Sequence, residues 1–232
     1  MMPEALARLR AVSPIPVPVV IGLQLAQSAV LFWLLGWLGL AAGERVGLDA
    51  PLLRAWVYRL PLPVDRRTRD FRLAIVAGLA VAALIVGLDL RFAPYLRHAT
   101  GAARAPSAWL GLLAAFYGGI SEEVLTRLFL MTGIAWLLAA FRHARAPGLP
   151  AWIYWTAIVA AALLFAAGHL PAAIKLLGAD PIVVTRTLVL NFPAGFVFGW
   201  LYWKRGLEHA MAGHFAADIV LHVLAPLAFT SR

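Results

Sequence analysis

The sequence predicts an all-α, polytopic transmembrane helix bundle. Hydrophobic residues make up 62% of the 232-residue chain, and charged residues make up only 13%. A soluble domain has about 45–50% apolar and about 25% charged residues. Six apolar segments are each long enough to cross a bilayer, which takes about 20 residues of helix. Residues 1–232 are therefore interpreted as a single integral membrane domain of six to eight membrane helices, with the polar site inside the bundle.

The predicted spans follow one another along the chain with short connections. They cover residues 18–42, 71–90, 107–141, 151–170, 182–203 and 207–228. The fourth span is expected to end at Pro171, since proline interrupts the hydrogen bonding of a helix. Between the first and second spans, residues 48–62 are largely apolar but contain Arg54 and Arg59. We expect this stretch to lie in the plane of the membrane interface.

The third segment is too long for one straight crossing. Gly118 and Gly119 interrupt it, and glycine is a poor helix former. We expect the helix to break there and to restart with Ser121 as its N-cap. Glu122 and Glu123 then fall in the first turn of the new helix, where the helix dipole favours negative charge. The piece before the break would be a half-helix, too short to span the membrane alone.

Basic residues predict the orientation of the chain, whose formal net charge is +9. Two spans separate each basic cluster from the next, so all three clusters fall on one side of the membrane. The clusters are Arg54, Arg59, Arg66, Arg67, Arg69 and Arg72, then Arg142 and Arg145, then Lys204 and Arg205. By the positive-inside rule this side is cytoplasmic, where basic loops meet anionic lipid. Arg8 and Arg10 then fall on the other side of the first span, unless residues 48–62 re-enter the membrane.

Composition also excludes several classes of function. The chain contains no cysteine, which rules out a cysteine nucleophile and a cysteine-ligated zinc. No basic stripe is interleaved with aromatic residues, so nucleic acid is not a predicted partner. Membrane lipid is the partner that the composition favours.

Two adjacent carboxylates inside the apolar third segment are the strongest functional signal. A charged side chain at the bilayer centre costs about 2.5–3.5 kcal/mol on insertion scales. Glu123 and Arg127 are i,i+4 neighbours on one helical face and can pair. Glu122 is turned by about 100° from Glu123 around the helix, so it is free to face a cavity. The alternative is that both carboxylates lie at a helix end and reach interfacial water.

Histidines recur in the later apolar segments. Phe165 and His169 have i,i+4 spacing near the end of the fourth span. His214, Asp218 and His222 follow one stripe of the last span at the same spacing, and an intramembrane aspartate needs a partner such as the imidazole one turn away. Taken alone, each group also fits a capping or structural hydrogen-bonded role.

Two other polar residues fall inside apolar segments. His209 lies roughly 140° from His214 around the helix, off the His214 stripe, and we expect it near the membrane interface. Asn191 in the fifth span is either a local helix irregularity or a site group.

The three motifs together, on three separate apolar segments, resemble the CPBP family. This family comprises the CAAX prenyl endopeptidases and bacteriocin-processing enzymes, and is also called the Abi family. The motifs read Glu122-Glu123-Val-Leu-Thr-Arg127, Phe165-Ala-Ala-Gly-His169 and His214-Phe-Ala-Ala-Asp218. The resemblance makes residues 107–226 the motif-bearing core. Two positions depart from the pattern: Thr126-Arg127-Leu128 stands where many members have Phe-Arg-Gly, and Asp218 stands where many have Asn.

The resemblance implies an intramembrane endopeptidase, a hydrolase acting on a membrane-associated peptide or protein. It implies that Glu122 and His169 activate a water molecule. It also implies that His214 and Asp218 stabilise the oxyanion, and that Glu123 and Arg127 form a supporting ion pair.

A metal ion is one way to run this chemistry. Glu122, His169 and His214 would make a His₂Glu set of the kind that holds catalytic zinc with one open position. The same residues also support a metal-free mechanism with a glutamate-activated water. The sequence allows either, because neither arrangement needs a residue that the other lacks.

Two other classes of function stay open. One is a non-proteolytic immunity or scaffold protein that keeps the same fold, although an inert scaffold has little reason to carry all three motifs. The other is a proton-coupled transporter with a Glu/His relay, although such transporters usually contain internal repeats and none is found here. The Ala- and Arg-rich composition favours a bacterial source and the cytoplasmic (inner) membrane. A membrane-anchored peptide or leader sequence is then favoured over prenylated CAAX proteins as the substrate.

Overall fold

Six long apolar helices dominate the computed structural model, which describes residues 15–61, 64–96, 107–147 and 149–229. The helices are Val17–Val46, Asp70–Tyr95, Ala108–Phe141, Ala151–Leu177, Pro181–Arg205 and Leu207–Leu227. Each is long and apolar enough to cross a membrane, and the described ranges contain no strand. The chain is therefore an all-α integral membrane protein, and the six predicted spans are confirmed.

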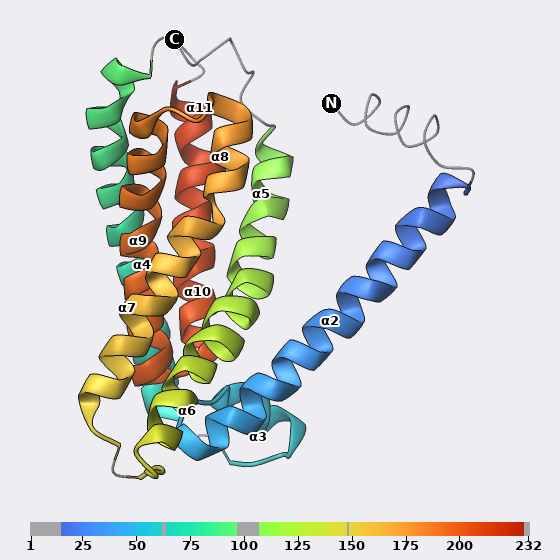
Figure 1. The fold of residues 1–232 in the computed structure, drawn as a ribbon, viewed down its shortest axis with the longest axis vertical. Coiled ribbons are helices and arrows are strands. Elements are labelled where there is room, and N and C mark those ends of the chain that lie inside the picture. The colour runs from blue at the N-terminus through green and yellow to red at the C-terminus, as the bar shows by residue number, and fades with distance from the viewer. Residues whose placement is uncertain (1–14, 62–63, 97–106, 148, 230–232) are drawn as a thin grey trace.

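Most spans are built from more than one helical element, and successive spans run in opposite directions (Figure 1). The elements are α2 (Val17–Val46), α3 (Pro51–Val57), α4 (Val64–Phe92), η1 (Ala93–Tyr95), α5 (Ala108–Phe116), η2 (Tyr117–Glu122), η3 (Val124–Met131), α6 (Thr132–Phe141), α7 (Ala151–Gly168), α8 (Leu170–Leu177), α9 (Pro181–Arg205), α10 (Leu207–Asp218), η4 (Ile219–Leu224) and α11 (Ala225–Phe229). α9 is central, since it packs against α4, α7 and α10. Its Phe198, Leu201 and Tyr202 are almost completely buried, as are Met131 and Ile158 beside it.

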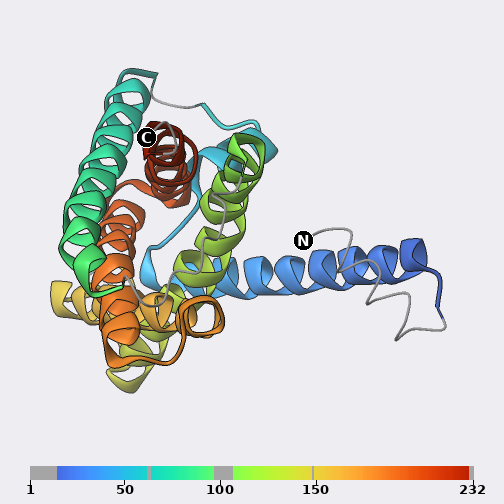
Figure 2. The ribbon, with the colours of Figure 1, turned by 90° about the horizontal axis from the view of Figure 1, so that it is seen from above.

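α2 stands apart from the other spans over much of its length. Figure 2 shows it extending sideways from the bundle, and only the part near its C-terminal end contacts η3 and α6. Gly39 lies in this contact, where a Cβ would collide with the backbone carbonyl of Leu128 in η3; a Cβ on Gly43 would instead collide with the carbonyl of Leu48 in the turn that follows α2. Small residues let membrane helices approach closely, so the contact of α2 with η3 depends on Gly39.

The predicted break at Gly118 and Gly119 is wrong. The chain runs as one helix from Ala108 to Phe141, and Ser121 caps no helix end. The middle of this helix is wound as two wide π segments, η2 and η3. π turns are rare and are frequently found at functional sites, and here they contain or adjoin both predicted glutamates.

The two glycines have a packing role instead. A Cβ on Gly118 would collide with the carboxylate of Asp218 and lie 3.0 Å from Nε2 of His214. A Cβ on Gly119 would lie 3.1 Å from the Cβ of Phe215. Glycine at these positions therefore lets α10 approach η2 closely enough for polar side chains of the two helices to meet.

Local predictions near the other helix ends had different outcomes. α7 ends at Gly168 and α8 starts at Leu170, so a helix does end just before Pro171, but Pro171 lies in the first turn of α8 and the prediction that the span ends there is wrong. The span continues through α8 to Leu177. Within the stretch 48–62, Pro51–Val57 form the short helix α3, where Glu208 Oε1 accepts a hydrogen bond from the Leu53 N–H at 2.6 Å. That this stretch lies in the membrane interface stays a prediction.

The basic clusters share one end of the bundle. α3, the end of α6 and the end of α9 all lie at the lower end of Figure 1, which places Arg54, Arg142 and Arg205 there. By the positive-inside rule we expect this end to be cytoplasmic. The orientation prediction also used five arginines that cannot be placed in this way. Arg8 and Arg10 lie outside the described residues, and the side chains of Arg66, Arg67 and Arg69 are not described.

This orientation can be tested because the chain has no native cysteine. We expect Ala179→Cys, between α8 and α9, to react with a membrane-impermeant maleimide in intact bacterial cells. We expect Ala144→Cys, after α6, to react only once the cells are permeabilised, because it lies at the basic end. The reverse labelling pattern would contradict the orientation.

Close packing of α4 against α10 can be tested at Gly78. A Cβ at this position would collide with the backbone carbonyl of Gly213, so Gly78→Ala should lower the free energy of unfolding in detergent by about 1–3 kcal/mol. Gly87→Ala on the same helix is the matched control, since nothing lies within 4 Å of its added Cβ. Alanine favours a helix over glycine by about 1 kcal/mol, so Gly87→Ala should be neutral or stabilising. Equal effects of the two changes would contradict the packing.

Candidate active site

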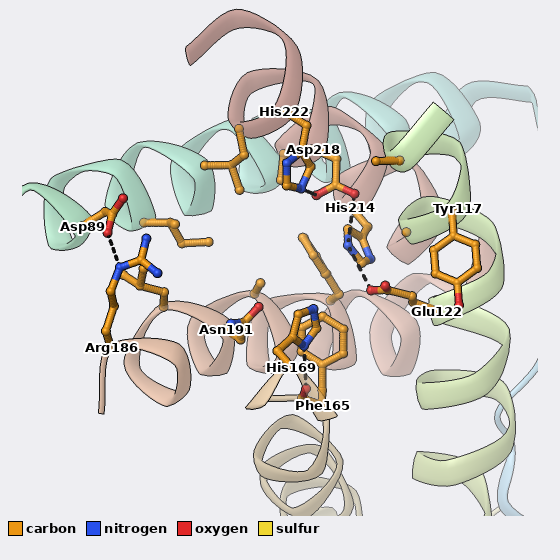
Figure 3. A pocket seen from close by; sticks show the side chains of 18 residues that line it. Asp89, Tyr117, Glu122, Phe165, His169, Arg186, Asn191, His214, Asp218 and His222 are labelled. Carbon is orange, nitrogen blue, oxygen red and sulfur yellow. Dashed lines mark hydrogen bonds and ion pairs between the residues drawn. The ribbon is translucent and has the colours of Figure 1, made fainter. Parts of the chain in front are cut away.

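A cavity of about 370 Å³ lies inside the bundle, lined by α4, the α5–η2 region, α7, α9 and the α10–η4 region. Four of the six predicted site residues line it: Glu122, His169, His214 and Asp218 (Figure 3). The other two, Glu123 and Arg127, are completely buried beside it. Among the described residues, the polar side chains that line the cavity are those of Asp89, Tyr117, Glu122, His169, Arg186, Asn191, His214, Asp218 and His222.

Glu123 joins two other charged or titratable groups. Its Oε2 lies 3.2 Å from Nε of Arg127, which is the i,i+4 pair that the sequence predicts. Its Oε1 accepts a hydrogen bond from Nδ1 of His214 at 2.9 Å. The guanidinium of Arg127 also lies over the ring of Phe165, 5.2 Å from the ring centroid. The sequence did not predict the Glu123–His214 contact, which joins the third span to the last.

Glu122 points elsewhere and faces the cavity. Its side chain is 25% exposed, whereas that of Glu123 is fully buried. Its Oε2 lies 3.9 Å from Nε2 of His214. This is longer than a hydrogen bond, but a small movement of the Glu122 side chain would bring the two atoms into hydrogen-bond distance. Its backbone carbonyl accepts a hydrogen bond from the hydroxyl of Thr126 at 2.6 Å. The two adjacent glutamates thus occupy different environments, as their angular separation on the helix predicts.

His214 is held between fixed partners, with one ring nitrogen left towards the cavity. Because Nδ1 bonds to Glu123, only Nε2 faces Glu122 and Asp218; Asp218 Oδ2 lies 3.5 Å from it. Phe198 stacks on the imidazole with ring centroids 4.7 Å apart. The other oxygen of Asp218, Oδ1, lies 3.6 Å from Nε2 of His222. The stripe of His214, Asp218 and His222 is therefore a connected polar row on one helix face.

His169 lies across the cavity from this row, at the junction of α7 and α8 (Figure 3). Its Nδ1 lies 2.8 Å from the backbone carbonyl oxygen of Phe165. A carbonyl can only accept, so Nδ1 carries the hydrogen and donates it. In the neutral ring Nε2 is then an acceptor. This places a potential base opposite His214.

Comparison with known proteins places the chain in a family. The sequence model of the Rce1-like type II CAAX prenyl endopeptidase family matches residues 104–220. The chain belongs to this family. No curated protein and no solved structure matches it. The matched region contains all three motifs of the Rce1-like chain, and it also contains every predicted site residue.

The sequence did not single out the charged pair at the other end of the cavity in this Rce1-like chain. Nε of Arg186 on α9 lies 2.7 Å from Oδ1 of Asp89 on α4. A signal was present, since both residues lie within apolar spans, where charges usually have a function. Their partnership could not be predicted, because the two residues are 97 positions apart.

Two weaker predictions are now placed. Asn191 lines the cavity and donates from Nδ2 to the backbone carbonyl of Thr187 at 2.8 Å, so it is a lining group within a continuous helix. That His209 lies near the membrane interface stays a prediction, because burial among helices does not fix its depth in the membrane. Its side chain is buried against Phe71, with ring centroids 4.5 Å apart, because the start of α10 packs against α4.

The described residues do not gather into a zinc site. Among them, no group of three or more His, Asp or Glu side chains is arranged to hold a metal ion. Nδ1 of both His169 and His214 is already engaged, which leaves one ring nitrogen on each. Metal-binding histidines are commonly held in this way, with the other ring nitrogen bonded to a carboxylate or a carbonyl, so zinc bound by Glu122, His169 and His214 and the metal-free mechanism both stay predictions of the sequence.

The different environments of the two glutamates predict different effects on stability. Glu123→Gln should lower the free energy of unfolding in detergent by about 3–5 kcal/mol, because it leaves the buried Arg127 charge without a counter-ion. Adding Arg127→Met should restore most of that loss, since both charges are then removed. Glu122→Gln is the matched control and should change stability little, because Glu122 is partly exposed. A large loss in Glu122→Gln, or none in Glu123→Gln, would contradict this assignment.

Proposed function

We propose that the chain is an intramembrane endopeptidase that hydrolyses a peptide bond of a membrane-associated peptide or protein. The observation that supports this most is the convergence of Glu122, His169 and His214 from three separate helices on one cavity. A hydrolase needs a base for water and a donor for the developing negative charge. The cavity offers candidates for both within the bundle.

Glu122 and His169 form the proposed base side. Both line the cavity, Glu122 through a partly exposed carboxylate and His169 through Nε2, which is the acceptor nitrogen of the neutral ring. A water molecule between them can donate one hydrogen to each. Proton transfer from this water to Glu122 then makes the oxygen nucleophilic.

His214 and Asp218 form the proposed electrophilic side. Glu123 already holds His214 through Nδ1, so the orientation of the imidazole does not depend on Asp218. When Nε2 of His214 carries a hydrogen, it can donate to the oxygen on which negative charge develops. Asp218 can donate to the same oxygen in its protonated form, as the Asn of many family members would. Each such donor typically contributes about 10²–10³-fold to the rate.

The proposed reaction has two steps. The water oxygen bonds to the peptide carbonyl carbon while its proton passes to Glu122, and the carbonyl oxygen becomes an oxyanion beside His214. The oxyanion then collapses and the carbon–nitrogen bond breaks. The proton held by Glu122 passes to the leaving nitrogen, which gives a carboxylic acid and an amine.

The proposed membrane and orientation of the protein restrict which substrates can reach the cavity. The proposed setting is the cytoplasmic membrane of a bacterium, with the basic end of the bundle inside. Asp89 and Arg186 lie within two turns of the opposite end, so the cavity extends away from the cytoplasmic side. The proposed partners are lipid and a membrane-anchored peptide or leader sequence, which would enter from the outer half of the bilayer.

Removal of either proposed base should slow hydrolysis strongly. Glu122→Gln and His169→Ala should each lower kcat by about 10²–10⁴-fold, the usual contribution of general acid–base catalysis. The measurement is fragment release from membrane-anchored reporter peptides by the purified protein in proteoliposomes. Equal cleavage by the wild type and Glu122→Gln would exclude the proposed mechanism.

Controls separate this result from a loss of folding or of a metal ion. Glu44→Gln makes the same chemical change on α2, outside the cavity, and should leave cleavage unchanged. Activity should also survive treatment with a chelator. Loss on chelation with recovery on adding zinc would overturn the metal-free mechanism, and an inactive wild type would favour the immunity or scaffold alternative.

A further inference from the structure

The mechanism leaves one charged pair of the cavity without a role. Arg186 on α9 and Asp89 on α4 lie at the end of the cavity away from Glu122 and His214 (Figure 3). A charge inside an apolar span is costly and usually marks a substrate or ion pathway. The pair lies within two turns of the helix ends, but both residues line the cavity, where they can take part in binding a ligand.

Arg186 is fixed on one edge and open on the other. Only its Nε is paired, with Oδ1 of Asp89 at 2.7 Å. The two Nη atoms have no partner among the described residues, and they point into the cavity (Figure 3). The side chain of Arg186 is 23% exposed, so a ligand in the cavity can reach it. Asp89 thus holds the guanidinium in place and leaves a planar two-donor edge unoccupied.

The geometry points to a carboxylate as the ligand. Two parallel N–H donors of a guanidinium match the two oxygens of a carboxylate, and such charge-assisted pairs are stronger than neutral hydrogen bonds. Glu122 and Asp218 at the other end of the cavity repel an anion. A peptide in the cavity would therefore lie with its carboxylate at Arg186 and its scissile bond at Glu122.

We propose that Arg186, positioned by Asp89, is a subsite for a carboxylate of the substrate, and this rests on the endopeptidase function proposed above. The carboxylate can be the C-terminal one or that of an acidic side chain. Asn191 lines the cavity between the two ends, and its side-chain oxygen can accept a hydrogen bond from the peptide backbone.

The helix sets the distance between the subsite and the scissile bond. Phe198, which stacks on His214, lies about 12 residues beyond Arg186 on α9, a rise of about 18 Å. An extended peptide advances about 3.3 Å per residue. The carboxylate should therefore lie within about five residues of the scissile bond.

Paired reporters test the subsite. One pair carries a free acid or an amide at a C-terminus within five residues of the cleaved bond. The other pair has an amidated end and carries Glu or Gln in that stretch. We expect the wild type to cleave the carboxylate member of at least one pair with a kcat/KM about 10-fold or more higher, the size typical of a hydrogen bond to a charged group. The pair that responds identifies the source of the carboxylate.

Variants assign the preference to Arg186. Arg186→Gln should bring the ratio within the responding pair close to 1, whereas Lys175→Gln, which removes a charge outside the cavity, should leave it unchanged. If Arg186→Gln does not fold, the double variant Asp89→Asn with Arg186→Gln removes both charges and should give the same ratio. A wild-type ratio of 1 in both pairs, or a ratio that survives loss of Arg186, would overturn the subsite.

Binding separates failure of the subsite from failure of the proposed function. Fluorescent versions of the same peptides should bind the Glu122→Gln protein in detergent with the same preference for a carboxylate, and that preference should be lost when Arg186→Gln is added. If the wild type cleaves no reporter but this preference is present, the endopeptidase function fails and the subsite stands. If the preference is absent, the subsite fails.

Discussion

The carboxylate of Glu123 bridges two buried groups that the site needs in fixed positions. One oxygen faces Arg127 on the same helix, and the other accepts a hydrogen bond from His214 on α10. All three side chains are buried, where an unpaired charge would cost several kcal/mol. The bridge therefore ties α10 to η2 and η3. It also holds the imidazole so that Nε2 faces the cavity.

This bridge requires two helices to approach more closely than ordinary side chains allow. Gly118 lies where a Cβ would meet Asp218 and His214, and Gly119 lies against Phe215. The chain is wound as π turns over the same stretch. In a membrane, small residues and interhelical polar contacts favour association of helices. Gly118 and Gly119, which from the sequence alone are interpreted as a helix break, are therefore the residues that permit the contact between Glu123 and His214.

The cavity has two polar ends of different character. Glu122, Asp218 and the histidines occupy one end, and the Asp89–Arg186 pair occupies the other. Each group there has a neighbour of opposite charge or a hydrogen-bonding partner, as the low dielectric of the bundle demands. The surface around them is apolar and suited to lipid. The polar groups available for the proposed chemistry thus lie in one cavity whose two ends differ in charge.

The sequence by itself determined the class of protein, the six spans and the contacts between side chains one helical turn apart. Glu123 with Arg127, and His214 with Asp218, follow from helical periodicity, which fixes which side chains share a face. Only the tertiary structure decided that His214 pairs with Glu123 and that Arg186 pairs with Asp89. It also decided that His209 is buried and that the third span is continuous. These features join residues about 90 positions or more apart, or depend on such contacts. They are set by how helices rotate and pack against one another, which periodicity along one helix does not specify.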